Sequence, residues 1–209
     1  MYQAKTRYQA ENVAEAYETQ RFRSLRGRLV NWLEKTAAIQ MLEGLPKESL
    51  ILDAPVGTGR ISAALEQTGW HVIGVDISAS MLQQAQQRHA ARLGLVQADI
   101  ERLPFMNNAV DAVVSYRLMA HLPGPVRQTA LREMARVTQG PLIINYHLSG
   151  TSALWALNRV MRRSALAAYP VTPRDVQAEA QACHLRITRV RALLPGVLDS
   201  YLYALARFT

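Results

Sequence analysis

The stretch LDAPVGTGRI, residues 52–61, ends an apolar run with a carboxylate and continues into two glycines separated by one residue. Gly57 and Gly59 permit backbone dihedrals that a side chain would forbid, and they let a ligand approach the main chain closely. Residues 49–54, SLILDA, have the pattern of a short apolar strand, and the residues that follow, as far as Thr68, have that of a helix ending at Gly69. The stretch is therefore a strand-to-helix loop, which is where open α/β sheets bind ligands.

The same strand-and-helix unit recurs on both sides of this loop. Further apolar strands are predicted over residues 70–76, 93–99, 109–116 and 141–146. Helices are predicted over residues 11–20 and 28–43, from the N-cap Ser78 to His89, and from Pro125 to Thr138. Because each strand is a nearly continuous apolar run between helices, the pattern predicts a parallel sheet covered on both faces.

The order of elements changes after residue 170. A short helix is followed by two successive strands, over residues 184–194 and 197–208, with Pro195 and Gly196 between them. Two successive strands of this kind predict a hairpin that adds one antiparallel strand to the sheet. The predicted fold is an α/β doubly wound sheet of seven strands, mostly parallel with one antiparallel C-terminal strand, and with helices on both faces.

Composition excludes several classes of protein. No run approaches 18 apolar residues, and the N-terminal residues mix charged with polar side chains where a signal peptide would be apolar. We therefore expect a cytoplasmic protein. The single Cys183 excludes an internal disulfide framework and a multi-cysteine zinc site, and no metal site is predicted. Two basic clusters, Arg21–Arg28 and Arg159–Arg163, contribute to a net charge of +8 and leave an anionic ligand, a membrane surface or nucleic acid open as partners.

The acidic residues at the strand ends narrow the choice of ligand. Asp76 ends the strand after the glycine loop, about where a nucleotide-binding fold places a carboxylate on ribose hydroxyls. A dinucleotide loop would read G-x-G-x-x-G, whereas this chain reads GTGRIS over residues 57–62. Asp53, at the end of the preceding strand, would repel a pyrophosphate but would suit a ligand that carries an ammonium and a sulfonium group. A nicotinamide oxidoreductase is thereby disfavoured.

Four motifs in order carry a family resemblance: DAPVGTG (53–59), VIGVDIS (72–78), QADIERLPFMNNAVDAVVS (97–115) and LREMARVTQGPLIIN (131–145). Together they resemble the class I S-adenosylmethionine-dependent methyltransferases, and among these the small-molecule family that includes the quinone-biosynthesis C-methyltransferases. The resemblance implies a Rossmann-like fold, S-adenosyl-L-methionine as cofactor and S-adenosyl-L-homocysteine as product. Pro55 replaces the first glycine of the family's loop and stiffens that turn.

The resemblance also assigns the cofactor site. It implies that Asp53, Gly57 and Gly59 hold the methionine part, that Asp76 accepts from the ribose hydroxyls and that Asp99 accepts from the adenine amino group. Ile77 and Ile100 would pack against the adenine. The complete predicted set is Asp53, Pro55, Gly57, Thr58, Gly59, Arg60, Asp76, Ile77, Met81, Asp99, Ile100 and Ser115.

Some of these acids also have a purely structural interpretation. Asp99 could cap a turn before Pro104, and Asp111 is expected to be a structural acid at the start of its strand. Met81, Leu82 and Ala85 are expected in the core.

Methyl transfer by in-line displacement requires alignment, exclusion of water and sometimes a base. The candidate bases follow the fourth and fifth strands: Tyr116 and His121 in SYRLMAHLPG, and His147 in NYHLSG. Histidine titrates near neutral pH and suits this role best.

Two absences narrow the methyl acceptor. The sequence after the fourth strand reads SYRL, without the N/D-P-P-Y motif of enzymes that methylate exocyclic amines, and no cysteine nucleophile follows the fourth or fifth strand. A small-molecule acceptor, anionic or amphipathic, is therefore favoured over nucleic acid. An RNA methyltransferase and a non-catalytic S-adenosylmethionine-binding protein remain alternatives.

The chain is expected to form one domain in four parts. These are a helical cover (1–45), a cofactor-binding core (46–146), an acceptor-covering insertion (147–182) and a C-terminal hairpin (183–209). Residues 1–28 and 147–182 are expected to close over the site. Within the insertion, residues 151–168 have an apolar face opposite arginines, which suits either a lid or transient contact with a membrane surface. Monomer and homodimer are both compatible with the sequence.

Overall fold

The computed structural model describes residues 24–89, 94–149, 169, 171–194 and 199–208. In these residues seven strands form one sheet in the order β3-β2-β1-β4-β5-β7-β6. The strands are β1 (Leu50–Asp53), β2 (His71–Asp76), β3 (Gly94–Gln97), β4 (Ala112–Ser115), β5 (Leu142–His147), β6 (Leu185–Ala192) and β7 (Ser200–Arg207). Neighbouring strands from β3 to β5 pair in parallel, whereas β7 pairs antiparallel with both β5 and β6. The predicted fold class is confirmed.

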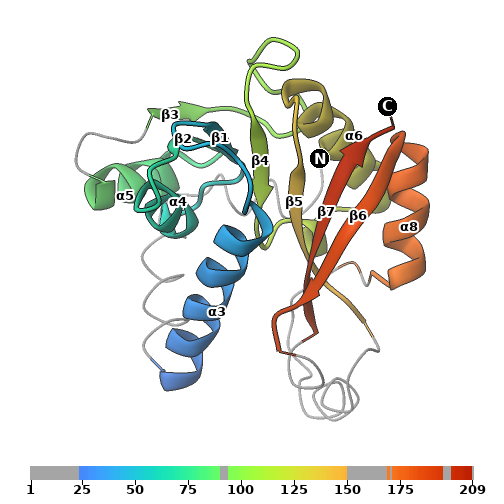
Figure 1. Cartoon of the computed structure of the whole chain (residues 1–209), viewed down its shortest axis with the longest axis horizontal. Coiled ribbons are helices and arrows are strands. Elements are labelled where there is room, and N and C mark those ends of the chain that lie inside the picture. The colour runs from blue at the N-terminus through green and yellow to red at the C-terminus, as the bar shows by residue number, and fades with distance from the viewer. Residues whose placement is uncertain (1–23, 90–93, 150–168, 170, 195–198, 209) are drawn as a thin grey trace.

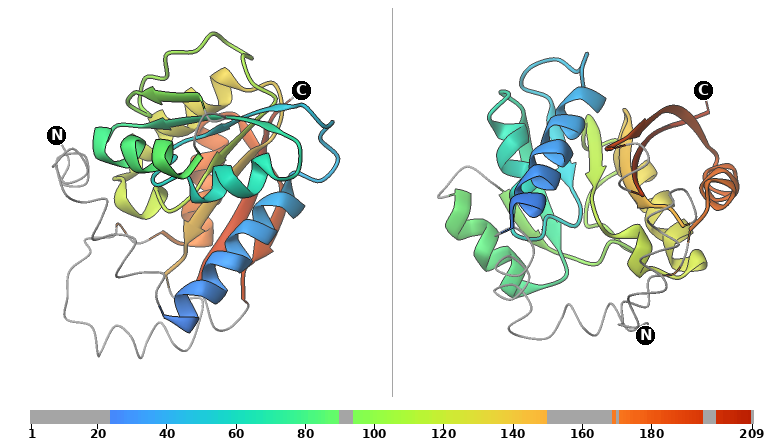
Figure 2. Two further views of the ribbon diagram at one scale, coloured as in Figure 1. Left: turned by 90° about the vertical axis from the view of Figure 1, so that its left-hand side faces the viewer. Right: turned by 90° about the horizontal axis from the view of Figure 1, so that it is seen from below.

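Helices cover both faces of the sheet (Figures 1 and 2). One face carries α3 (Leu25–Met41), α4 (Arg60–Glu66) and α5 (Ala79–His89), which bury Ala38, Leu65 and Ala85 against it. The other carries α6 (Gly124–Val137) and α8 (Pro173–Ala182), which bury Leu131 and Val176. A short 3-10 helix, η1 (Met119–His121), links β4 to α6. Each face of the sheet thus has its own apolar core.

Local sequence explains where the helices begin. Ser24 caps α3 by accepting from the backbone N–H of Gly27 at 3.1 Å, so the helix starts before the predicted residue 28. Ser78 accepts from the N–H of Met81 at 3.4 Å, as its predicted capping role requires. Thr172 and Asp175 form a reciprocal capping box at the start of α8. The helix η1 was not predicted, since three residues carry no periodic pattern.

The strand order reverses next to β1, which lies between β2 on one side and β4 on the other. The glycine loop leaves the carboxyl end of β1 at this switch point. Asp111, predicted to be structural, accepts from the N–H of Leu50 at 2.7 Å and so fixes the start of β1. The fold therefore delivers the loop, Asp76 and the end of β4 to one edge of the sheet.

Gly74 in β2 lies directly beneath the glycine loop. A Cβ at this position would lie 2.7 Å from Cγ2 of Val56 and 2.9 Å from Cδ2 of Leu95. We expect Gly74→Ala to lower the free energy of unfolding by about 1–3 kcal/mol, because overpacking forces these side chains aside. Gly94→Ala is the matched control, since its Cβ would meet Ile73 at an ordinary 3.7 Å. Urea denaturation of the two variants measures the difference, and equal stabilities would refute the packing argument.

The predicted cover is only partly described. The helix predicted over residues 11–20 lies outside the described residues, as do residues 1–23 and 150–168. Residues 173–182, which the prediction placed in the acceptor cover, instead form α8 and bury Val176 and Ala180 in the core beside α6 and β6. The apolar side of α8 thus packs on the sheet, and the acceptor cover over residues 147–182 stays a prediction.

Candidate functional site

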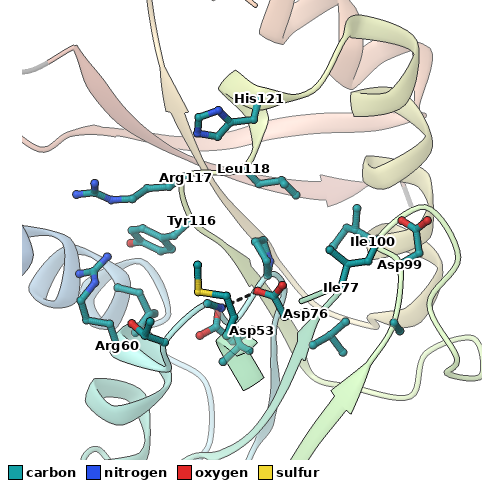
Figure 3. A pocket seen from close by; sticks show the side chains of 18 of the residues that line it. Asp53, Arg60, Asp76, Ile77, Asp99, Ile100, Tyr116, Arg117, Leu118 and His121 are labelled. Atoms are coloured by element: carbon teal, nitrogen blue, oxygen red, sulfur yellow. Dashed lines mark hydrogen bonds between the residues drawn. The ribbon is translucent and has the colours of Figure 1, made fainter. Parts of the chain in front are cut away.

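A pocket of about 120 Å³ lies at the carboxyl ends of β1, β2 and β4 (Figure 3). Its wall combines the glycine loop, the ends of the next two strands and the segment from the end of β4 into η1. Twelve of the residues predicted for the cofactor or for catalysis line it: Asp53, Pro55, Gly57, Thr58, Arg60, Asp76, Ile77, Met81, Asp99, Ile100, Tyr116 and His121.

The glycine loop requires its glycines for backbone reasons. Gly57 has φ 54° and Gly59 has φ 76°, in the left-handed region that other residues adopt only with strain. The N–H of Val56 bonds to the carbonyl of Val75 at 2.7 Å, which ties the loop to β2. The Ala54–Pro55 peptide bond is cis. The hydrogen bond between Val56 and Val75 and the left-handed backbone at Gly57 and Gly59 fix the loop at the pocket wall.

Asp76, at the end of β2, orients the loop as well as facing the cavity. One carboxylate oxygen accepts from the N–H of Gly57 and the other from the N–H of Ser78, both at 2.9 Å. Burial raises the pKa of Asp76, and these backbone hydrogen bonds oppose the rise. A carboxylate has room for about four hydrogen bonds, so each oxygen can still accept one from a ligand.

Asp53, at the end of β1, is 1% exposed. Its Oδ2 accepts from the hydroxyl of Ser62 at 2.6 Å, while its Oδ1 is buried with no hydrogen-bond partner among the described residues. Burial raises the pKa of this carboxyl to about 7, although Ser62 and the charge of Arg60 lower it. A buried acceptor that lacks a donor at a pocket wall matches a cationic donor on a ligand.

The pocket has chemically distinct sides. Figure 3 shows Asp99 and Ile100 on one side, and Arg60, Tyr116 and Arg117 on the other. Asp99 lines the cavity and also accepts from the N–H of Glu101 at 3.1 Å, so it caps a turn while facing the pocket. The acidic side can accept hydrogen bonds from a nucleoside, and the basic side can bind an anion.

Comparison with known proteins gives this geometry a family. Residues 51–140 match a methyltransferase domain family. A malonyl-[acyl-carrier protein] O-methyltransferase of Pectobacterium atrosepticum is 31% identical over 175 residues, which cover 79% of this chain and 67% of that one. A demethylmenaquinone methyltransferase of Beutenbergia cavernae is 35% identical over 54% of this chain and 46% of that one. The chain thus spans two thirds of the first relative and less than half of the second.

The chain belongs to the class I S-adenosylmethionine-dependent methyltransferases. Solved structures agree on the fold: the magnesium protoporphyrin IX methyltransferase of Synechocystis with bound S-adenosylhomocysteine has a TM-score of 0.73 at 19% identity, with 88% of each chain covered. As a member of this class, the chain has S-adenosylmethionine as its cofactor. Asp53 supports that fit from the structure itself, since its unpartnered buried oxygen suits a ligand with an ammonium group.

Three predicted residues of the methyltransferase do not line the pocket. Gly59 is the N-cap of α4. Ser115 is fully buried in β4, with a hydroxyl that has no partner among the described residues. His147 ends β5 and pairs in register with Ser200 of β7.

The prediction missed several wall residues of the methyltransferase. The apolar ones carry no chemical signal of their own in the sequence: Val56, Ile61, Val75, Ala98, Leu118 and Leu122. Arg117 has φ 57° without being glycine, and it directly follows Tyr116. Its position just past a strand end was the one available signal. In the described part of the chain, no helix is long and apolar enough to cross a membrane.

Proposed function

We propose that this methyltransferase transfers the methyl group of S-adenosylmethionine to a small-molecule acceptor that enters between the end of β4 and η1. The supporting observation is the wall formed there by Leu118, His121 and Leu122, which is apolar apart from one imidazole. An apolar wall with one polar group suits the exclusion of water and the orientation of a small acceptor. The acceptor side then lies beside Arg117.

The other residues follow from the same placement. We assign Asp76 to the ribose hydroxyls and Asp99 with Ile100 to the adenine, on the acidic side of the pocket. The glycine loop and Asp53 receive the methionine part, with Oδ1 of Asp53 accepting from the ammonium group. When bound, the cofactor supplies an electrophilic methyl group, while these side chains align it and exclude water.

Tyr116 is better suited to the pocket wall than to proton abstraction. Burial and the nearby charge of Glu34 raise the pKa of Tyr116 well above its ordinary value, so it stays protonated at neutral pH. Its hydroxyl already donates to the backbone carbonyl of Glu34 at 3.2 Å. His121 lines the cavity and is the residue we assign to the acceptor. His147 lies outside the lining, so we do not assign it a role in proton transfer.

The acceptor is proposed to be anionic or amphipathic. The relatives are named for malonyl-[acyl-carrier protein] and demethylmenaquinone, the first an acid and the second a quinone precursor. Transfer of tritium from methyl-labelled S-adenosylmethionine to malonyl-coenzyme A, a short-chain quinol and total RNA tests the class, with Asp76→Ala as blank. Labelling of a small molecule supports the proposal, and labelling of RNA alone would contradict it.

An RNA acceptor predicts a different physical behaviour. Contacts to phosphates make binding weaken by about 0.9 log units per phosphate for each tenfold rise in salt on a duplex. We expect no such dependence, because the two basic clusters contain a single aromatic residue, Phe22, and none of the recognition motifs of RNA-binding modules. Filter binding to total RNA at low and moderate salt measures this slope. Tight, strongly salt-dependent retention would favour RNA over a small acceptor.

A further inference from the structure

Glu34, in the middle of α3, is a fully buried carboxylate far in sequence from the glycine loop. Its Oε2 lies 2.9 Å from Nη2 of Arg60, and its Oε1 lies 2.6 Å from Nη2 of Arg117 and accepts from Nε of Arg117 at 2.9 Å. Both arginine side chains are only 10% exposed. Glu34 therefore joins α3 to two cations at the pocket wall.

The arrangement also fixes the backbone next to the pocket. Arg117 is held in a left-handed conformation, and its N–H donates to Oδ1 of Asn145 in β5 at 3.4 Å. Asn145 in turn donates to the hydroxyl of Ser200 at 2.9 Å. A non-glycine residue keeps such a conformation only when its surroundings impose it. Here Glu34 and Asn145 hold Arg117 from its side chain and from its backbone.

Arg60 and Arg117 lie on the pocket wall opposite Asp99 and Ile100, where the proposed orientation places the methionine part (Figure 3). Arg60 begins the helix that follows the glycine loop, and its charge acts on Asp53. An α-amino acid carries a carboxylate beside its ammonium group. On this wall Asp53 can pair with the ammonium group, and the guanidinium groups of Arg60 and Arg117 can pair with the carboxylate. The wall is therefore complementary to both charges of the amino acid.

We propose that Glu34 is a positioning residue that makes α3 part of the cofactor site, by directing Arg60 and Arg117 at the carboxylate of the methionine part. The inference rests on the proposed function, because it takes S-adenosylmethionine to occupy the pocket in the orientation given above. A guanidinium group has five N–H donors in a fixed planar arrangement. A carboxylate that binds one edge of the group therefore sets the direction in which the remaining N–H donors point. Asn31, one turn earlier in α3, accepts from Nη1 of Arg60 and supports the same orientation.

Glu34→Gln tests the proposal, because it keeps the shape of the side chain and removes its charge. We expect affinity for S-adenosylhomocysteine to fall about fivefold, since two charge-assisted hydrogen bonds are misdirected rather than deleted. Affinity for 5′-methylthioadenosine, which has the adenosine but no amino-acid group, should change by less than about twofold. Calorimetry on the full chain gives both constants.

Glu179→Gln is the matched control. Glu179 forms an equally buried pair with Arg127, at 2.6 Å and with side-chain exposures of 7% and 6%, on the opposite face of the sheet. Both variants should unfold at a lower temperature, but only Glu34→Gln should bind S-adenosylhomocysteine more weakly. Arg117→Lys provides a second test if Glu34→Gln folds poorly. Lysine keeps the positive charge but lacks the planar fork of arginine, so this variant should also bind S-adenosylhomocysteine more weakly.

The possible outcomes distinguish a failure of the proposed function from a failure of the role proposed for Glu34. A wild-type chain that binds neither adenosine ligand would contradict the proposed function. A wild-type chain that binds S-adenosylhomocysteine, with Glu34→Gln and Arg117→Lys binding it as tightly, would overturn only the role of Glu34. An equal loss of both ligands in Glu34→Gln would also overturn that role, since it would show a general structural effect.

Discussion

Replacing Asp76 with Ala should weaken binding of S-adenosylhomocysteine by at least about a hundredfold. We propose that the Asp76 carboxylate accepts hydrogen bonds from two ribose hydroxyls. Hydrogen bonds to charged groups contribute roughly 1.5–3 kcal/mol each. The structure adds a second cause, because Asp76 also accepts from the N–H groups of Gly57 and Ser78 and so holds the glycine loop in place. Isothermal titration calorimetry measures the loss directly.

Two variants control this experiment. Asp76→Asn keeps one oxygen acceptor and should lose less affinity than Asp76→Ala. Asp111→Ala removes an acid that bonds to Leu50 at the opposite end of β1, so it should lower stability and leave the dissociation constant unchanged. An unchanged constant in Asp76→Ala would remove Asp76 from the cofactor site.

Affinity for S-adenosylhomocysteine should rise about tenfold between pH 6 and pH 8. Burial raises the pKa of Asp53 to about 7 in the free protein, and an ammonium group binds the ionised carboxylate. The ionised fraction grows from about a tenth at pH 6 to about nine tenths at pH 8 for a group of this pKa. Calorimetry over this range, repeated in buffers with different enthalpies of ionisation, should also show proton release on binding below pH 7.

The same group has an opposite effect on stability. Because the folded-state pKa of Asp53 lies above its ordinary value of 3.8, the stability that its neutral form contributes is fully present below about pH 4 and is lost as the pH rises through about 7. Asp53→Asn should remove this loss and also flatten the pH dependence of binding. If the variant kept a tenfold rise in affinity, the titrating group would be another residue.

The parts of the candidate site that are predictable from the sequence are those that depend on local pattern. Asp53 and Asp76 end apolar strands, and parallel strands bring their carboxyl ends to one edge, so their proximity follows from the fold alone. Gly57 and Gly59 were found because a left-handed backbone favours glycine. These features need only a few consecutive residues to be recognised.

The parts that were missed depend on contacts across the chain. Glu34 and Arg117 are 83 residues apart, and in sequence Glu34 is one charge among several on an amphipathic helix. Arg117 follows a predicted strand, but its left-handed conformation depends on Asn145 and Ser200 in other strands. The packing of α8 against α6 and β6 likewise joins segments far apart in the chain, and no local pattern predicts it.

A crystal structure of the chain with S-adenosylhomocysteine tests the central claim most directly. Both ribose hydroxyls should lie within hydrogen-bond distance of the Asp76 carboxylate, and the ligand ammonium group should lie at Oδ1 of Asp53. A ligand found elsewhere, or in the pocket with its amino-acid group at Asp99 and its adenine at Arg60, would contradict the account.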